Sequence, residues 1–131
     1  MTRILEAVSM TVSQADIDLY AELTNDYNPL HVDPSFASRT PMGGTIAHGT
    51  LSVNLIWQSL ARTFGPATLE RLELDIRFLK PLRAGGTVTA GGEALADAPG
   101  IFEVWVRDAA GVDLIAGQVV LDGSAPRAAS A

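Results

Sequence analysis

The chain has 131 residues and a net charge of −6; 47% of the residues are apolar and 18% are charged. This balance predicts a soluble globular protein with an ordinary core and argues against a nucleic-acid partner, because nucleic acids select basic surfaces. No apolar run approaches the roughly 20 residues that span a bilayer, and the lack of cysteine excludes disulfides and thiolate chemistry.

The chain begins with one strand signal followed by one helix signal. Residues 3–11 mix β-branched and polar side chains and predict a first strand. Ser13 and Asp16 have the spacing of a capping box, in which a hydroxyl precedes a carboxylate by three residues. We therefore expect a helix over residues 14–24.

The next stretch leads into a long apolar helix. Asn28-Pro29 predicts a turn, because the residue before proline is disfavoured in the helical region. A single helical turn is expected over residues 34–38 and a glycine-rich connection over residues 41–44. Residues 47–64 contain no proline and carry apolar side chains at helical spacing, which predicts a helix buried on most sides.

The second half of the sequence changes to the period of β-strands. Apolar and charged residues alternate over residues 72–78, which predicts a half-buried strand. Three more strands are expected over residues 87–95, 101–107 and 114–121, separated by turn sequences. We predict an α+β domain over residues 1–122, an antiparallel sheet wrapped around a long central helix, followed by a disordered tail over residues 123–131.

The only two histidines of the chain, His31 and His48, lie near Asp26 and the Asn28-Pro29 turn. A carboxylate and an imidazole five positions apart on one rigid bend suit proton transfer near neutral pH. This region is the candidate active site. A metal site is not expected, because two histidines with scattered carboxylates do not give a closed ligand set.

These residues resemble the MaoC-like, (R)-specific enoyl-CoA hydratase family of the hot-dog fold. The resemblance rests on the Asp-x-Asn-Pro-Leu-His sequence that begins at Asp26, on Ile46-Ala47-His48-Gly49, and on the segment 77–82. It implies a hot-dog domain whose sheet pairs with that of a second protomer, a hydro-lyase activity, and an acyl-CoA substrate without a further cofactor. The sequence departs from the family where Asn25 replaces a common glycine, where Thr50 replaces a common methionine, and in Gly85-Gly86.

The resemblance also implies roles for single residues. Asp26 and His31 would hold the catalytic water, and the backbone N–H of Gly49, at a helix start, would stabilise the thioester oxyanion. Asn28, Pro29 and His48 would shape the site. Lys80 and Arg83 would either meet the phosphates of coenzyme A or form a solvated surface.

Several alternatives stay open at this point. In the first alternative, the enzyme hydrates trans-2-enoyl-CoA to (R)-3-hydroxyacyl-CoA or catalyses the reverse dehydration. In the second, it dehydrates 3-hydroxyacyl chains bound to a carrier protein. In the third, the domain binds acyl thioesters without catalysis. A thioesterase is disfavoured by the turn motif. The apolar surplus favours a homodimer or higher homo-oligomer, and the N-terminal residues, which lack signal-peptide features, favour a cytoplasmic protein.

Overall fold

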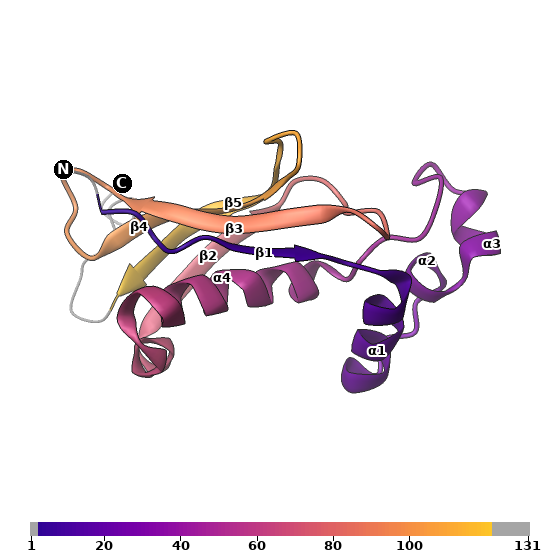
Figure 1. The fold of residues 1–131 in the computed structure, drawn as a ribbon, viewed down its shortest axis with the longest axis horizontal. Helices are drawn as coiled ribbons and strands as arrows, with labels where there is room; N and C mark the ends of the chain where they lie inside the picture. Colours follow the sequence, from indigo (N-terminus) through magenta and orange to yellow (C-terminus); the bar gives the residue numbers. More distant parts are fainter. Residues whose placement is uncertain (1–2, 122–131) are drawn as a thin grey trace.

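The computed structural model describes residues 3–121 of the chain, so the tail predicted over residues 123–131 lies outside the described part. The architecture is a five-stranded antiparallel sheet in the order β1-β3-β4-β5-β2. One long helix, α4 (Gly49–Phe64), runs along a face of this sheet, and three shorter helices gather at one end (Figure 1). Within residues 3–121, no helix is both long and apolar enough to cross a membrane.

The four predicted strand regions and the first strand are all present. The strands are β1 (Val8–Thr11), β2 (Leu72–Phe78), β3 (Thr87–Ala94), β4 (Ile101–Asp108) and β5 (Asp113–Leu121). Residues 3–5 pair with the end of β3 as predicted, whereas β1 begins only at Val8, because the backbone of Glu6 between them bonds to α4. Its N–H donates to Thr63 Oγ1, and its carbonyl accepts from Ser59 Oγ.

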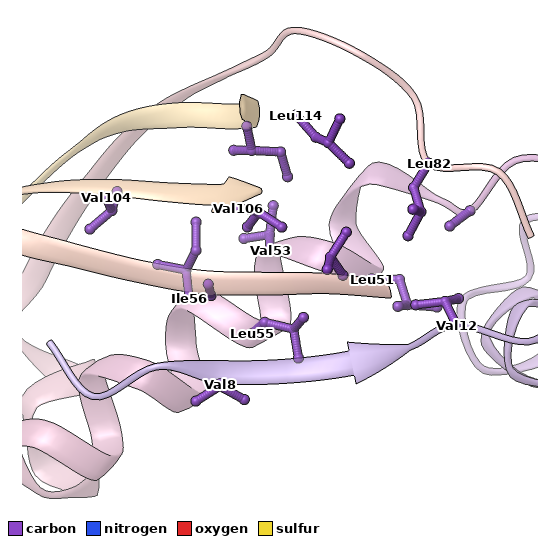
Figure 2. Packing of buried hydrophobic residues seen from close by; sticks show 14 of the residues in the cluster. Val8, Val12, Leu51, Val53, Leu55, Ile56, Leu82, Val104, Val106 and Leu114 are labelled. Atoms are coloured by element: carbon purple, nitrogen blue, oxygen red, sulfur yellow. The ribbon is translucent and has the colours of Figure 1, made fainter. Parts of the chain in front are cut away.

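The core lies between the sheet and one face of α4 (Gly49–Phe64). Figure 2 shows Leu55 and Ile56 of α4 among Val8 of β1 and Val104 and Val106 of β4. Burial of each such side chain stabilises the fold by about 1.5–3 kcal/mol.

The opposite face of α4 is open, since the sheet covers only one side of the helix. Asn54 and Gln58 are exposed there, and Trp57 is half-buried. The prediction that this helix is buried on most sides is nevertheless confirmed for the described residues, because beyond Gly49 the exposed residues Thr50, Asn54, Gln58 and Arg62 form a single stripe along it. Next to this stripe, Trp57 lines a hollow of about 420 Å³ together with Leu19 and Leu23.

The helical elements follow the sequence signals closely. Helix α1 (Gln14–Thr24) has the predicted bounds and the predicted capping box. The Asn28-Pro29 turn proves to be the start of a short helix, α2 (Pro29–Val32), and α3 (Pro34–Ser38) follows it. A 3₁₀ helix, η1 (Pro66–Glu70), was not predicted.

Helix α4 begins two residues later than predicted. Ala47 is held in extended pairing, because its N–H donates to the carbonyl of Leu82 at 2.8 Å and the neighbouring Ile46 forms a bridge with Arg83. The helix can begin only where this pairing ends, and His48 takes its N-cap position.

Candidate active site

The end of α1 fixes the backbone of Asp26. Asn25 adopts the left-handed conformation with φ of 55°, and the N–H of Asp26 donates to Ala21 O at 3.0 Å. This is the Schellman arrangement that commonly ends helices at glycine or asparagine. It accounts for Asn25 at a position where glycine is common, since asparagine tolerates this conformation.

Helix α2 carries His31 toward the same place. Asn28 caps this helix, with its Oδ1 accepting from the Leu30 N–H at 3.0 Å, and Pro29 occupies the first helical position, where no amide hydrogen is needed. Both residues are therefore architectural, as predicted for Asn28. The side chain of Asp26 is exposed, and its Oδ1 accepts a long bond of 3.3 Å from the Asn28 N–H.

The orientation of His31 follows from one hydrogen bond. Its Nδ1 lies 2.8 Å from the carbonyl oxygen of Ile46. A carbonyl only accepts, so Nδ1 carries the hydrogen, and in the neutral ring Nε2 keeps its lone pair. His31 therefore turns a proton-accepting nitrogen away from the backbone.

His48 lies behind the pair formed by Asp26 and His31. Its side chain is buried, and its Nε2–H donates to the carbonyl oxygen of Asp26 at 3.0 Å. Its ring stacks on that of His31, with centroids 3.9 Å apart, and meets the ring of Tyr20 edge-on. Among the described residues, its Nδ1 has no hydrogen-bond partner.

The three groups open into a cavity of about 460 Å³ at the first turn of α4. Asp26, His31, His48 and Gly49 line one side of the cavity, and the segment from Phe78 to Leu82 lines another. Gly49 lies against Phe78: a Cβ at Gly49 would be 2.5 Å from Cε1 of that ring. A side chain at this position would thus push into the cavity wall.

The two predicted basic contacts are placed differently. Lys80 lines the cavity and is exposed. Arg83 is not among the lining residues, and its Nη2–H donates to the carbonyl oxygen of Gly43 at 3.1 Å. Lys80 is therefore in a position to meet a charged ligand group at the cavity, whereas Arg83 braces the connection before α4.

The structure brings one carboxylate and both imidazoles closer together than the sequence suggested. Ligand-type atoms of Asp26, His31 and His48 lie within 4.8 Å of one another. In His48, however, Nε2 faces a carbonyl and Nδ1 is buried. Only Asp26 and His31 therefore offer accessible metal-ligand atoms, fewer than the three protein ligands of a typical catalytic zinc site. The absence of a metal stays a prediction.

Sequence reasoning missed two residues that brace the site. The Gln14 side-chain amide donates to the His31 carbonyl at 2.8 Å and accepts from Thr45 Oγ1. The Tyr20 hydroxyl donates to Thr50 Oγ1 at 2.8 Å. Both residues lie on α1, whose helical pattern gave no sign that its polar side chains reach across to α2 and α4.

Comparison with known proteins identifies a common family. Residues 2–101 match the family model described as a MaoC like domain. An (R)-specific enoyl-CoA hydratase from Rhodospirillum rubrum is 36% identical over 91% of this chain and 81% of that protein. A 3-hydroxybutyryl-CoA dehydratase from Methylorubrum extorquens is 37% identical, and the match spans 63% of this chain but only about half (53%) of that protein.

Solved structures agree with this family. The (R)-hydratase from A. caviae, described as involved in PHA biosynthesis, superimposes with a TM-score of 0.77 at 28% identity, over 92% of this chain and 93% of its own. Its match supports the hot-dog fold, which the five-stranded sheet and the central helix show directly. The chain belongs to the MaoC-like domain family.

Proposed function

We propose that this protein is an (R)-specific enoyl-CoA hydratase, which adds water to trans-2-enoyl-CoA to give (R)-3-hydroxyacyl-CoA, or catalyses the reverse dehydration. The observation that carries the proposal is the convergence of Asp26, His31 and Gly49 on one cavity. The relatives named as hydratases and dehydratases support the same reaction.

In the proposed reaction, one water molecule bonds to both Asp26 and His31. The ionised carboxylate accepts hydrogen bonds only, and the Nε2 lone pair of neutral His31 accepts one. As the water oxygen attacks Cβ of the enoyl chain, the pair removes one of its protons, and the π electrons move toward Cα. A proton delivered to Cα on the same face completes the addition, so the pair acts as one acid–base unit.

Negative charge develops on the thioester oxygen between these two steps. Gly49 is the first residue of α4, and amides in the first turn of a helix lack intrahelical acceptors and lie at the positive end of the helix dipole. A preorganised donor at this point stabilises the transition state more than the ground state. We assign the oxyanion contact to the Gly49 N–H.

The proposed substrate enters between the first turn of α4 and the segment after β2. Lys80 lies on this route and supplies a positive charge for the phosphates of coenzyme A. The reaction needs no cofactor, because the acid–base pair and the amide provide all the groups that it uses.

The proposal includes a homodimer. β2 is an edge of the sheet within the described part of the chain, and the side chains of Phe78 and Leu79 at its end are 58% and 50% exposed while lining the cavity. Pairing of β2 with a second copy would extend the sheet and cover these side chains. A cytoplasmic location is also proposed, and cell fractionation would test it.

The test is a spectrophotometric assay of purified protein with crotonyl-CoA and longer trans-2-enoyl-CoA thioesters. We expect loss of the enoyl thioester absorbance and a product of R configuration on chiral analysis. Absence of turnover together with measurable acyl-CoA binding would contradict the enzyme and favour a thioester-binding module. Turnover restricted to carrier-protein thioesters would favour the dehydratase of carrier-bound chains.

A further inference from the structure

His48 is the histidine that the proposed reaction does not use, yet it contacts both residues that the reaction needs. The side chain is only 3% exposed. It therefore forms part of the cavity wall and does not project into the path of a substrate. Its contacts with Asp26 and His31 have different physical consequences.

The first contact fixes the backbone that carries the Asp26 carboxylate. The Asp26 N–H donates to Ala21 O at the end of α1, and the Asp26 carbonyl accepts from His48 Nε2–H. The residue is thus held on both sides, by two different helices. Displacement of its main chain would move the carboxylate away from the water that it binds.

The second contact restrains the ring of His31. The bond from Nδ1–H to Ile46 O fixes one edge of this ring. That bond alone would let the His31 ring rotate about the axis of the bond. The ring of His48 blocks one face of the His31 ring, with the two centroids 3.9 Å apart and the two ring planes at 25° to each other. Together the two contacts define where Nε2 points.

His48 is itself held rigidly. It is the N-cap residue of α4, and the ring of Tyr20 packs on it edge-on at 5.0 Å while the Tyr20 hydroxyl is bonded to Thr50. Its Nδ1 is buried without a partner among the described residues, which is unfavourable compared with a carbon ring of the same shape. What the imidazole provides here and a phenyl ring would lack is the hydrogen bond that Nε2–H donates to the Asp26 carbonyl.

We propose that His48 is a positioning residue, which fixes the Asp26 backbone through its Nε2–H and the His31 ring through stacking. This inference rests on the proposed hydratase function. It assigns no proton transfer to His48. It predicts that loss of His48 lowers kcat while KM changes little, because substrate contacts remain and only the alignment of the acid–base pair is lost.

Three substitutions separate the two contacts. His48→Phe keeps a ring and removes the donor, His48→Gln keeps an amide donor and removes the ring, and His48→Ala removes both. We expect kcat for crotonyl-CoA to fall about 10- to 100-fold in His48→Ala, since small misplacements can cost about 10²-fold. The Phe and Gln variants should each recover part of this loss.

Thr63→Val is the matched control. Thr63 lies on the same helix, far from the cavity, and bonds to Glu6 N–H and to the Ser59 carbonyl. Its substitution should lower the melting temperature and leave kcat unchanged. An effect of His48 substitutions that arose from lower stability alone would appear in Thr63→Val as well.

Nitrogen-15 NMR of the imidazoles gives a readout that does not depend on turnover. We expect the neutral His31 ring to carry its hydrogen on Nδ1 in the parent protein and in His48→Phe, and to shift toward a mixture of tautomers in His48→Gln. Parental kcat in His48→Ala, or parental His31 tautomers in His48→Gln, would overturn the inference. If the parent hydrates no enoyl thioester, the proposed function fails, and the NMR result alone decides whether His48 positions His31.

Discussion

Asp26 and His31 reach one cavity from opposite ends of a short stretch of chain, the carboxylate from the end of α1 and the imidazole from α2. Neither side chain is needed to fill the core, because Asp26 is exposed and His31 is only half-buried. Their contribution to activity should therefore exceed their contribution to stability. This separation makes substitutions at the two positions informative.

We expect Asp26→Asn and His31→Ala each to lower kcat by about 10²- to 10⁴-fold, the usual contribution of a general acid–base group. The double variant should be little worse than the worse single one, because a water released by one group is no longer placed for the other. Enoyl-CoA turnover measures this, and thermal melting shows whether the fold is kept. Near-normal turnover in either variant would exclude that residue from catalysis.

Gly49→Ala tests the oxyanion contact. The added methyl group would meet the Phe78 ring, which is exposed and can rotate away, so the melting temperature should change little. Activity should fall about 10- to 100-fold, because the methyl group or the displaced ring occupies the space beside the helix amide. Recovery in Gly49→Ala/Phe78→Ala would identify the ring as the obstruction, whereas full activity in Gly49→Ala alone would argue against the contact.

At the scale of single elements, the two ends of α1 determine where the site begins. The capping box of Ser13 and Asp16 starts the helix, and the left-handed Asn25 ends it one residue before Asp26. The capping box was predictable from two residues that lie close together in sequence. The Schellman ending was not predicted, because asparagine adopts that conformation only where the tertiary context requires it.

Asn25→Ala should destabilise the protein by about 1–2 kcal/mol, the cost of a left-handed conformation for a residue with a Cβ and no local hydrogen bond. It should also lower kcat, since the adjacent Asp26 loses its fixed backbone. Asn25→Gly is the matched variant and should retain both stability and activity. Denaturant melts and crotonyl-CoA kinetics of the pair provide the measurement; equal behaviour of the two variants would contradict this account.

The capping box also makes a prediction about acid stability. Hydrogen bonds from the Ser13 backbone and from its side chain hold the pKa of Asp16 below its usual range. Because the folded-state pKa is the lower one, the stabilisation is complete above the unfolded value near pH 4 and is lost as the pH falls through the folded value. Ser13→Ala should reduce this dependence and cost about 1 kcal/mol at neutral pH. Unfolding free energies measured between about pH 2 and pH 6 test it, and an unchanged acid slope in Ser13→Ala would refute it.

At the scale of the whole molecule, the alternation of apolar and charged residues predicted β2, and the helical spacing of apolar residues predicted α4. The other strands were predicted from β-branched content and from the turn sequences that separate them. The sequence did not reveal which polar side chains cross between elements. Gln14 bonds across to α2, and Arg83 turns to Gly43 and not to the cavity, since long side chains choose partners only once the elements are packed. The Asp26–His31 pair was predictable because both residues share one short motif. The stacking of His31 on His48 was not predicted, because it forms only once the segment before α4 packs against α2, where the Ile46 N–H donates to the Leu30 carbonyl.

The proposed dimer predicts that activity depends on protein concentration. Dilution below the dissociation constant should lower specific activity, because Phe78 and Leu79 would lose the neighbour that covers this side of the cavity. Sedimentation velocity measured alongside the assay should show the dimer and the activity disappearing together. A monomer that sediments as one species and retains full specific activity would contradict the dimer.

The strand order has a consequence for the time at which the site forms. The segment that carries Asp26, His31 and His48 lies between β1 and α4, and β1 pairs with β3, where Ser9 meets Thr89 across 80 positions of sequence. The extended pairing before α4 likewise requires Leu82. Such non-local contacts form slowly, because a long loop must close before they stabilise the chain. The capped helix α1 can form early, but we expect the acid–base pair to align only after the ribosome has released the chain through β3.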